Sequence, residues 1–88
     1  MSETGTIVKN VVEYIVSEIV EDKKSVKVEI ASSTDESVQI EVRTSPDDMG
    51  RVIGKRGRVA RAIRTVAQAA ADEEGLDSSV EFLSLIHI

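Results

Sequence analysis

The chain has 88 residues and a mass of 9.6 kDa, which is room for one domain with a single hydrophobic core. It contains no cysteine and one histidine, which excludes a disulfide framework, a thiolate zinc site and a catalytic histidine pair. We therefore expect no metal and no other cofactor. Aromatic residues make up 2% of the chain, which argues against nucleic-acid binding through a row of stacked rings. Because no apolar run is long enough for a membrane span or a signal peptide, the sequence predicts a cytoplasmic protein.

Charge is distributed unevenly along the chain, although the net charge is only -5. Residues 1–48 contain five basic and eleven acidic side chains, residues 49–71 six basic and no acidic ones, and residues 72–88 five acidic ones. The six basic side chains are Arg51, Lys55, Arg56, Arg58, Arg61 and Arg64. A basic patch on an acidic body attracts a polyanion to one face, whereas the alternative interpretation is a solvated helix face without a ligand.

The first half of the chain predicts a helix and a hairpin. Residues 1–5 are short and polar and are expected to be flexible. Apolar residues at every fourth position predict an amphipathic helix over residues 6–21. Valine and isoleucine then alternate with polar residues over residues 25–31 and 37–44, which predicts two strands. The short polar connection between the strands favours an antiparallel hairpin.

The second half predicts two helices and a strand. Ser45 before Pro46 is typical of a helix start, and a short helix is predicted over residues 46–53. A second helix is predicted over residues 58–74, followed by a strand over residues 78–82. Its buried face is expected to consist of Val59, Ile63, Val66 and Ala70. The order predicts an α+β domain in which all helices cover one face of a three-stranded mixed sheet.

The six residues 83–88 match one reading frame of the transposase adapter that is used to prepare sequencing libraries. We therefore expect them to be a non-native tail and residues 6–82 to be the domain. The alternative is a natural strand end with His87 at its tip. His87 is a poor catalytic candidate under either interpretation.

Two glycines, Gly54 and Gly57, enclose Lys55 and Arg56 between the two predicted helices. Glycine lacks a Cβ atom, so a phosphate chain can approach the backbone closely at such a turn. The backbone N–H groups at the start of the next helix, together with its dipole, favour an anion there. This glycine spacing alone is weak evidence, but the Val-Ile lead-in, the following helix and the preceding strands make it specific.

With these elements in this order, the chain resembles a KH domain of the bacterial type II kind, αββααβ, and more narrowly the KhpA family of small single-domain KH proteins. The resemblance covers residues 7–82. It implies binding of single-stranded RNA, with the loop 54–57 clamping the backbone of about four nucleotides. The RNA-binding residues that it implies are Ile53, Gly54, Lys55, Arg56, Gly57, Arg58 and Arg61.

The resemblance also assigns roles to these residues. The two glycines shape the clamp, Lys55 and Arg56 meet phosphates, and Ile53 lines an aliphatic groove for bases. Many KH motifs have a large aliphatic residue three positions after the second glycine, where this chain has Ala60, a departure that the KhpA-like pattern shares. For Arg64 an RNA contact and a surface ion pair are equally plausible.

The resemblance further implies a bacterial post-transcriptional regulator or RNA chaperone that forms a homodimer and pairs with KhpB, a larger KH-containing RNA-binding protein. Two alternatives remain open: a helix-turn-helix-like DNA binder, and a protein-interaction or dimerisation module based on the alanine-rich end of the second long helix. No enzymatic activity is expected. A nucleotide-binding phosphate loop needs four residues between its glycines, whereas only three separate Gly50 from Gly54.

Overall fold

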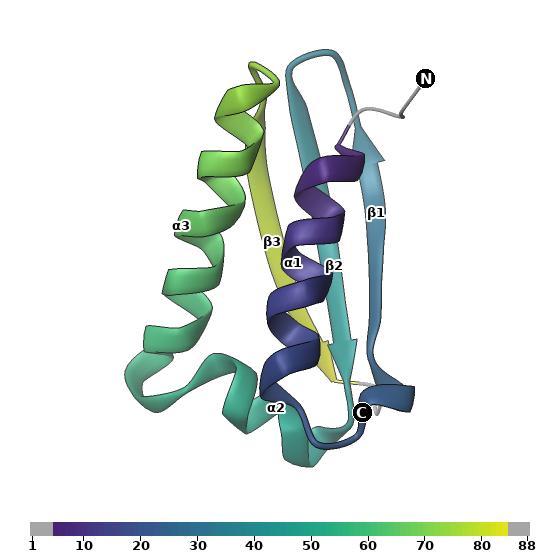
Figure 1. Ribbon diagram of the computed structural model, residues 1–88, viewed down its shortest axis with the longest axis vertical. Helices are drawn as coiled ribbons and strands as arrows, with labels where there is room; N and C mark the ends of the chain where they lie inside the picture. The colour runs from purple at the N-terminus through teal and green to yellow at the C-terminus, as the bar shows by residue number, and fades with distance from the viewer. Residues whose placement is uncertain (1–4, 85–88) are drawn as a thin grey trace.

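A computed structural model describes residues 5–84 of the chain (Figure 1). Its elements are α1 (Thr6–Ile19), the 3₁₀ turn η1 (Lys23–Ser25), β1 (Lys27–Ser33), β2 (Ser37–Thr44), α2 (Pro46–Ile53), the 3₁₀ turn η2 (Lys55–Gly57), α3 (Arg58–Glu73) and β3 (Asp77–Ser84). The strands form one sheet in the order β1-β2-β3, with β1 antiparallel and β3 parallel to β2. The predicted α+β fold with a mixed sheet is confirmed.

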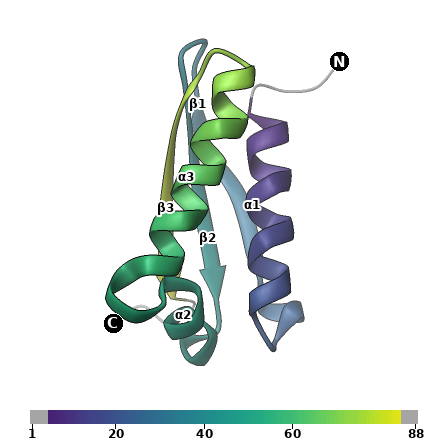
Figure 2. The same cartoon turned by 60° about the vertical axis from the view of Figure 1, so that its left-hand side comes forward.

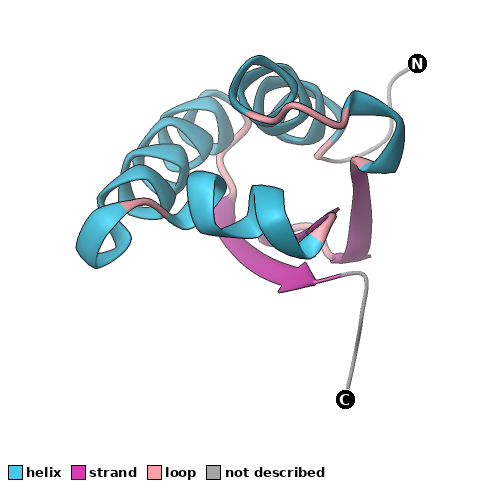
Figure 3. Cartoon of the chain, turned by 90° about the horizontal axis from the view of Figure 1, so that it is seen from below, coloured by secondary structure: helices cyan, strands magenta, loops and turns pink. Residues whose placement is uncertain are grey.

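The two long helices, α1 and α3, lie on one face of the sheet, and α2 lies across the end at which β2 finishes (Figures 1 and 2). The view along the strands shows the helices on one side of the sheet (Figure 3). In β2 the side chains of Val38, Ile40 and Val42 are buried, while the alternate positions are partly exposed. This alternation is typical of a sheet with one dry face. Among the described residues, no helix has the length and apolarity that crossing a membrane requires.

The core consists mainly of β-branched side chains from the sheet and all three helices. Its largest fully buried apolar members are Val8, Val12, Val16, Val38, Ile40, Val42, Val52 and Ile63. Such residues have low intrinsic helix propensity, so α1 depends on its packing against the sheet.

The buried face of α3 differs from the predicted one. Ile63 is buried as expected, but Val66 is 43% exposed and Val59 is only partly buried. The stripe that packs inward consists of Ala60, Ile63, Ala67 and Ala71. Alanine lets the helix lie close to the sheet, while Val59 packs at the margin of the core and Val66 is left on the outward side.

Element boundaries depart from the predictions where turns intervene. α1 ends at Ile19, and η1 delays the start of β1 to Lys27. The carboxylate of Asp22 accepts a hydrogen bond from Ser25 Oγ at 2.7 Å, which stabilises this turn. β3 is longer than predicted because it pairs with β2 along the whole range from Asp77 to Ser84.

Most of the two predicted terminal segments lies outside the described residues. Of the predicted flexible residues 1–5 only Gly5 is described; it is buried, and its carbonyl accepts the N–H of Lys9 at 2.9 Å. Of the predicted tail 83–88 only Leu83 and Ser84 are described, as the end of β3. The non-native origin of that tail stays a prediction.

Candidate nucleic-acid interface

The loop 54–57 makes a tight turn between α2 and α3 through backbone conformations of positive φ. The φ angles of Gly54, Arg56 and Gly57 are 75°, 56° and 72°. The N–H of Gly54 donates to Gly50 O at 2.9 Å and closes α2, and the N–H of Gly57 donates to Gly54 O at 3.1 Å. Arg56 adopts the left-handed conformation without being glycine, at a cost of about 1 kcal/mol.

The two glycines serve different physical purposes. A Cβ atom added to Gly54 would lie 2.5 Å from Val59 Cγ2, so the loop packs directly on the first turn of α3. A Cβ added to Gly57 would meet no atom within 4 Å. Glycine is therefore required at position 57 only for its backbone conformation. At position 54 it is required both for its backbone conformation and for its close packing against Val59.

The cations of the loop and of the first turns of α3 are free of ion pairs within residues 5–84. Lys55, Arg56, Arg58 and Arg61 are all exposed, and none is joined to an acidic side chain in this part of the chain. Ile53 ends α2 beside the loop and is 37% exposed. All seven residues predicted for the site thus lie on one continuous segment from the end of α2 into α3.

Arg51 and Arg64 have internal partners, so the basic patch is smaller than the sequence indicates. Arg51 Nη2 lies 2.7 Å from Glu21 Oε1, and its Nη1 lies 2.8 Å from Asp48 Oδ1. Arg64 Nε donates to Val80 O at 3.2 Å, and Arg64 Cζ lies 5.1 Å from the ring centroid of Phe82. The second contact is a cation–π interaction. Four basic side chains of the six remain available to a ligand.

Sequence reasoning missed the side chains that bind the backbone of β3, the outer strand of the sheet beside β2. Gln68, one turn after Arg64, accepts the N–H of Ser78 at 2.9 Å and donates to Leu76 O at 3.2 Å. Together with the bond from Arg64 to Val80 O, these contacts occupy three backbone groups between Leu76 and Val80. Only the spacing of four between Arg64 and Gln68 hints at a shared helix face.

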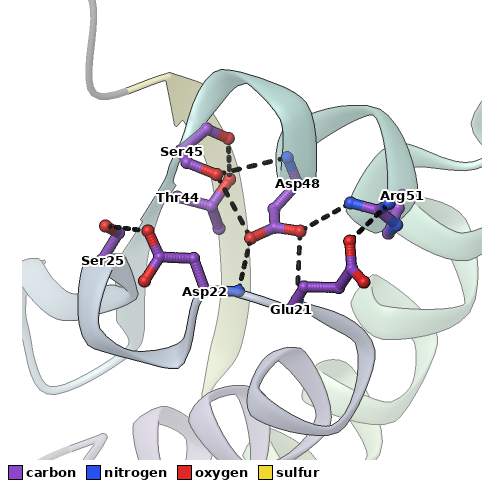
Figure 4. Close-up of polar contacts among 7 residues, drawn as sticks. All are labelled: Glu21, Asp22, Ser25, Thr44, Ser45, Asp48 and Arg51. Carbon is purple, nitrogen blue, oxygen red and sulfur yellow. Dashed lines mark hydrogen bonds and ion pairs between the residues drawn. The ribbon is translucent and has the colours of Figure 1, made fainter.

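Asp48 in the first turn of α2 is a second feature that the sequence did not reveal. The predicted helix cap at Ser45 is confirmed, since Ser45 Oγ accepts the N–H of Asp48 at 3.4 Å. The carboxylate of Asp48 is buried, however, and accepts the backbone N–H groups of Glu21 and Asp22 at 3.1 and 3.0 Å (Figure 4). These backbone hydrogen bonds lower the pKa of Asp48 below its usual value of 3.8, with help from Ser45 and Arg51 and against the opposing effect of burial.

An apolar groove of about 340 Å³ runs between α1 and α3 beside the loop. Its lining residues are Ile15, Ile19, Arg58, Val59, Ala62, Ile63 and Val66. The valines that were expected in the core of α3 therefore form the wall of this groove.

An αββααβ domain with a mixed sheet and a Gly-x-x-Gly loop between its second and third helices is a KH domain of type II. Sequence comparison identifies the family within this class. The family described as "KhpA/KhpB, KH domain" matches residues 9–82, and the chain belongs to this family.

Several curated relatives named "RNA-binding protein KhpA" align with most of the chain. The protein from Clostridium perfringens is 44% identical over 75 residues, which are 85% of this chain and 99% of the relative. The protein from Borreliella burgdorferi is 36% identical over 94% of this chain and 99% of its own length. The protein from Aquifex aeolicus is 39% identical over 85% of this chain and 94% of its own length.

Proposed function

We propose that this protein binds single-stranded RNA, with the loop 54–57 as a clamp on the sugar-phosphate backbone. The observation that carries the proposal is the set of four exposed cations without ion pairs in the described residues, gathered around a turn of positive φ. Membership of a family whose relatives bear the name RNA-binding protein supports it.

The clamp binds RNA through positive charge and backbone hydrogen-bond donors and does not catalyse a reaction. Lys55 and Arg56 project from the turn, and Arg58 and Arg61 continue the positive surface along α3. No side chain caps the N-terminus of α3 in the described residues, so the positive end of its dipole adds to the attraction for phosphate. Ile53 offers an exposed aliphatic surface to a base beside the phosphates. Contacts to phosphate hold the strand without reading its sequence, so we expect weak base preference and no catalytic step.

The proposal is tested by replacing Lys55 and Arg56 together with aspartate and titrating labelled single-stranded RNA by fluorescence anisotropy. We expect this variant to lose binding while its circular dichroism spectrum and melting point stay close to those of the parent. The matched control replaces Lys24 and Lys27, two exposed lysines of η1 and β1, with aspartate. It changes the net charge equally and should retain most of the affinity.

Two further measurements distinguish this function from the alternatives. Neutralising three or four phosphates predicts a slope of roughly -2 to -3 for log K against log salt, at about 0.7 per contact. Duplex RNA and duplex DNA should bind more weakly than the single strand. Tighter binding to duplex DNA would favour a helix-turn-helix-like function, and full binding by the loop variant would refute the clamp.

We also propose that the protein forms a homodimer, and that it pairs with KhpB, through the outward face of α1 and α3. The apolar groove between these helices and the exposed Val66 support this second role. α3 begins with arginines and ends with Asp72 and Glu73, so two copies packed with α3 antiparallel would bring opposite charges together. Val66→Asp should convert the dimer to a monomer in analytical ultracentrifugation, whereas Thr65→Asp should leave it intact.

Membership of the family supports a proposal for the biological setting. We propose a post-transcriptional regulator or RNA chaperone that acts in the bacterial cytoplasm, with residues 6–82 as the functional domain and residues 83–88 dispensable. Crosslinking to RNA in cells followed by sequencing tests the role, and a chain ending at residue 82 tests the domain assignment.

A further inference from the structure

The short helix α2 carries the RNA-binding loop, yet its own apolar contacts are few. It has eight residues, and its buried apolar side chains are Met49 and Val52. A helix of this length is not stable without external contacts. Because the N–H of Gly54 bonds to Gly50 O in the last turn, any shift of α2 also moves the first glycine of the loop.

A polar cluster at the other end of α2 supplies such a contact. The Asp48 carboxylate accepts four hydrogen bonds: from the N–H groups of Glu21 and Asp22, from Arg51 Nη1 at 2.8 Å and from Ser45 Oγ at 3.2 Å (Figure 4). Arg51 also pairs with Glu21, at 2.7 Å. We call Asp48, Arg51 and the segment Glu21-Asp22 the latch.

The latch joins segments that are distant in sequence. Asp48 and Glu21 are separated by 27 positions, and the latch ties α2 to the chain that leaves α1. Asp48 is 1% exposed and both of its oxygens have donors, so its position is sharply defined. Arg51 lies one turn before Gly54, so the latch acts on the segment that leads into the loop.

We propose that Asp48 and Arg51 are positioning residues for RNA binding: they hold the loop 54–57 in its binding conformation and do not themselves contact RNA. This inference rests on the proposed clamp function. It removes Arg51 from the RNA-binding patch, although the sequence places it among the basic residues.

Asp48→Asn tests the proposal through the direction in which it changes the RNA affinity. Removing an acidic charge favours binding of a polyanion by long-range electrostatics. Loss of the latch acts in the opposite direction, because the asparagine NH₂ would face a donor N–H in either orientation. If the competent loop conformation falls to about one fifth of the population, Kd rises about fivefold.

The matched control is Asp47→Asn. Asp47 is the exposed neighbour in the same helical turn and makes no side-chain hydrogen bond or ion pair within residues 5–84, so this variant has the same charge change without loss of the latch. We expect Asp47→Asn to bind RNA as tightly as the parent or slightly more tightly. Both affinities are measured well below the melting temperature. Equal RNA affinity of the two folded variants would overturn the proposal.

Arg51→Gln gives an independent test that does not depend on the folding of the Asp48 variant, since the Arg51 side chain is 47% exposed. Affinity should fall while the slope of log K against log salt stays unchanged. A slope smaller in magnitude by about 0.7 would identify Arg51 as a direct phosphate contact and overturn the proposal.

A third readout separates failure of the latch from failure of the clamp. The amide ¹H–¹⁵N signals of Gly54 and Gly57 in the RNA-free protein should shift in Asp48→Asn and stay near the parent positions in Asp47→Asn. If the parent itself binds no RNA, the proposed function fails, and these signals still decide whether the latch positions the loop. Unchanged glycine signals in Asp48→Asn would count against positioning.

Discussion

Gly54 is in contact with Val59, and a single added carbon atom on the glycine would lie 2.5 Å from the valine methyl group. Gly54 begins the loop that we propose binds RNA and Val59 lies in the first turn of α3, so the turn is tightly packed against α3 on its inner side. Its outer side is open, since a Cβ atom added to Gly57 would meet no atom within 4 Å.

The first prediction compares alanine at these two glycines. Gly57 has left-handed helical angles (φ 72°, ψ 18°), which cost an L-residue roughly 1 kcal/mol, whereas Gly54 (φ 75°, ψ 174°) lies in a region that is essentially restricted to glycine. Gly54→Ala also meets Val59, so we expect it to lower the melting temperature and the RNA affinity more than Gly57→Ala does. Thermal denaturation followed by circular dichroism shows which of the two variants has the lower melting temperature. A larger effect at Gly57 would contradict the packing.

The second prediction concerns Arg61 and Arg64, two arginines one turn apart with opposite roles. Arg64→Ala loses the hydrogen bond to Val80 O and the contact with Phe82, so the free energy of unfolding should fall by about 1 kcal/mol. Arg61→Ala should leave stability within about 0.5 kcal/mol of the parent and weaken RNA binding instead. Urea denaturation and RNA titration of both variants check whether Arg64 acts on stability and Arg61 on RNA binding. The assignment fails if Arg64→Ala affects RNA binding alone.

The third prediction follows from the lowered pKa of Asp48. The folded state binds the Asp48 proton more weakly than the unfolded state, so its stabilising effect is complete above about pH 5 and is lost as pH falls through the folded pKa. The parent should therefore be more stable than Asp48→Asn at neutral pH, and the difference should shrink below about pH 4. Urea midpoints measured from pH 7 to pH 3 test this. A stability difference between the parent and Asp48→Asn that does not change with pH would refute the conclusion that Asp48 is a charged, hydrogen-bonded carboxylate in the folded protein.

The fourth prediction tests which face of α3 is buried. Ala67 is completely enclosed, so Ala67→Leu overpacks the space between α3 and the sheet and should cost about 1–3 kcal/mol. Val66→Leu on the groove side should change stability by less than about 0.5 kcal/mol. Comparable losses in thermal melts of the two variants would contradict the observed orientation of the helix.

Local patterns were sufficient to predict β2 and α2 to the residue. β2 alternates strictly between apolar and polar side chains, and the Ser45-Pro46 pair marks where α2 begins. The loop glycines were likewise found from spacing, because the backbone conformations that they adopt are closed to most other residues. These features depend only on neighbours in the sequence.

The rest depends on contacts between distant segments. The buried stripe of α3 was missed because alanines carry little apolar weight in a periodicity, although they allow the closest approach to the sheet. The burial of Asp48 depends on backbone groups 26 and 27 positions away. The partners of Arg64 lie on a strand that follows it by 16 or more positions. No local pattern contains such information.

The side chains of Arg64 and Gln68 have a consequence for how neighbouring copies of the protein behave. A bare outer strand recruits a strand from another molecule and so begins aggregation. Here Leu76 O, the N–H of Ser78 and Val80 O are already bonded within the chain. These three groups are therefore not available to a strand from another copy, which limits pairing between copies along this part of the edge.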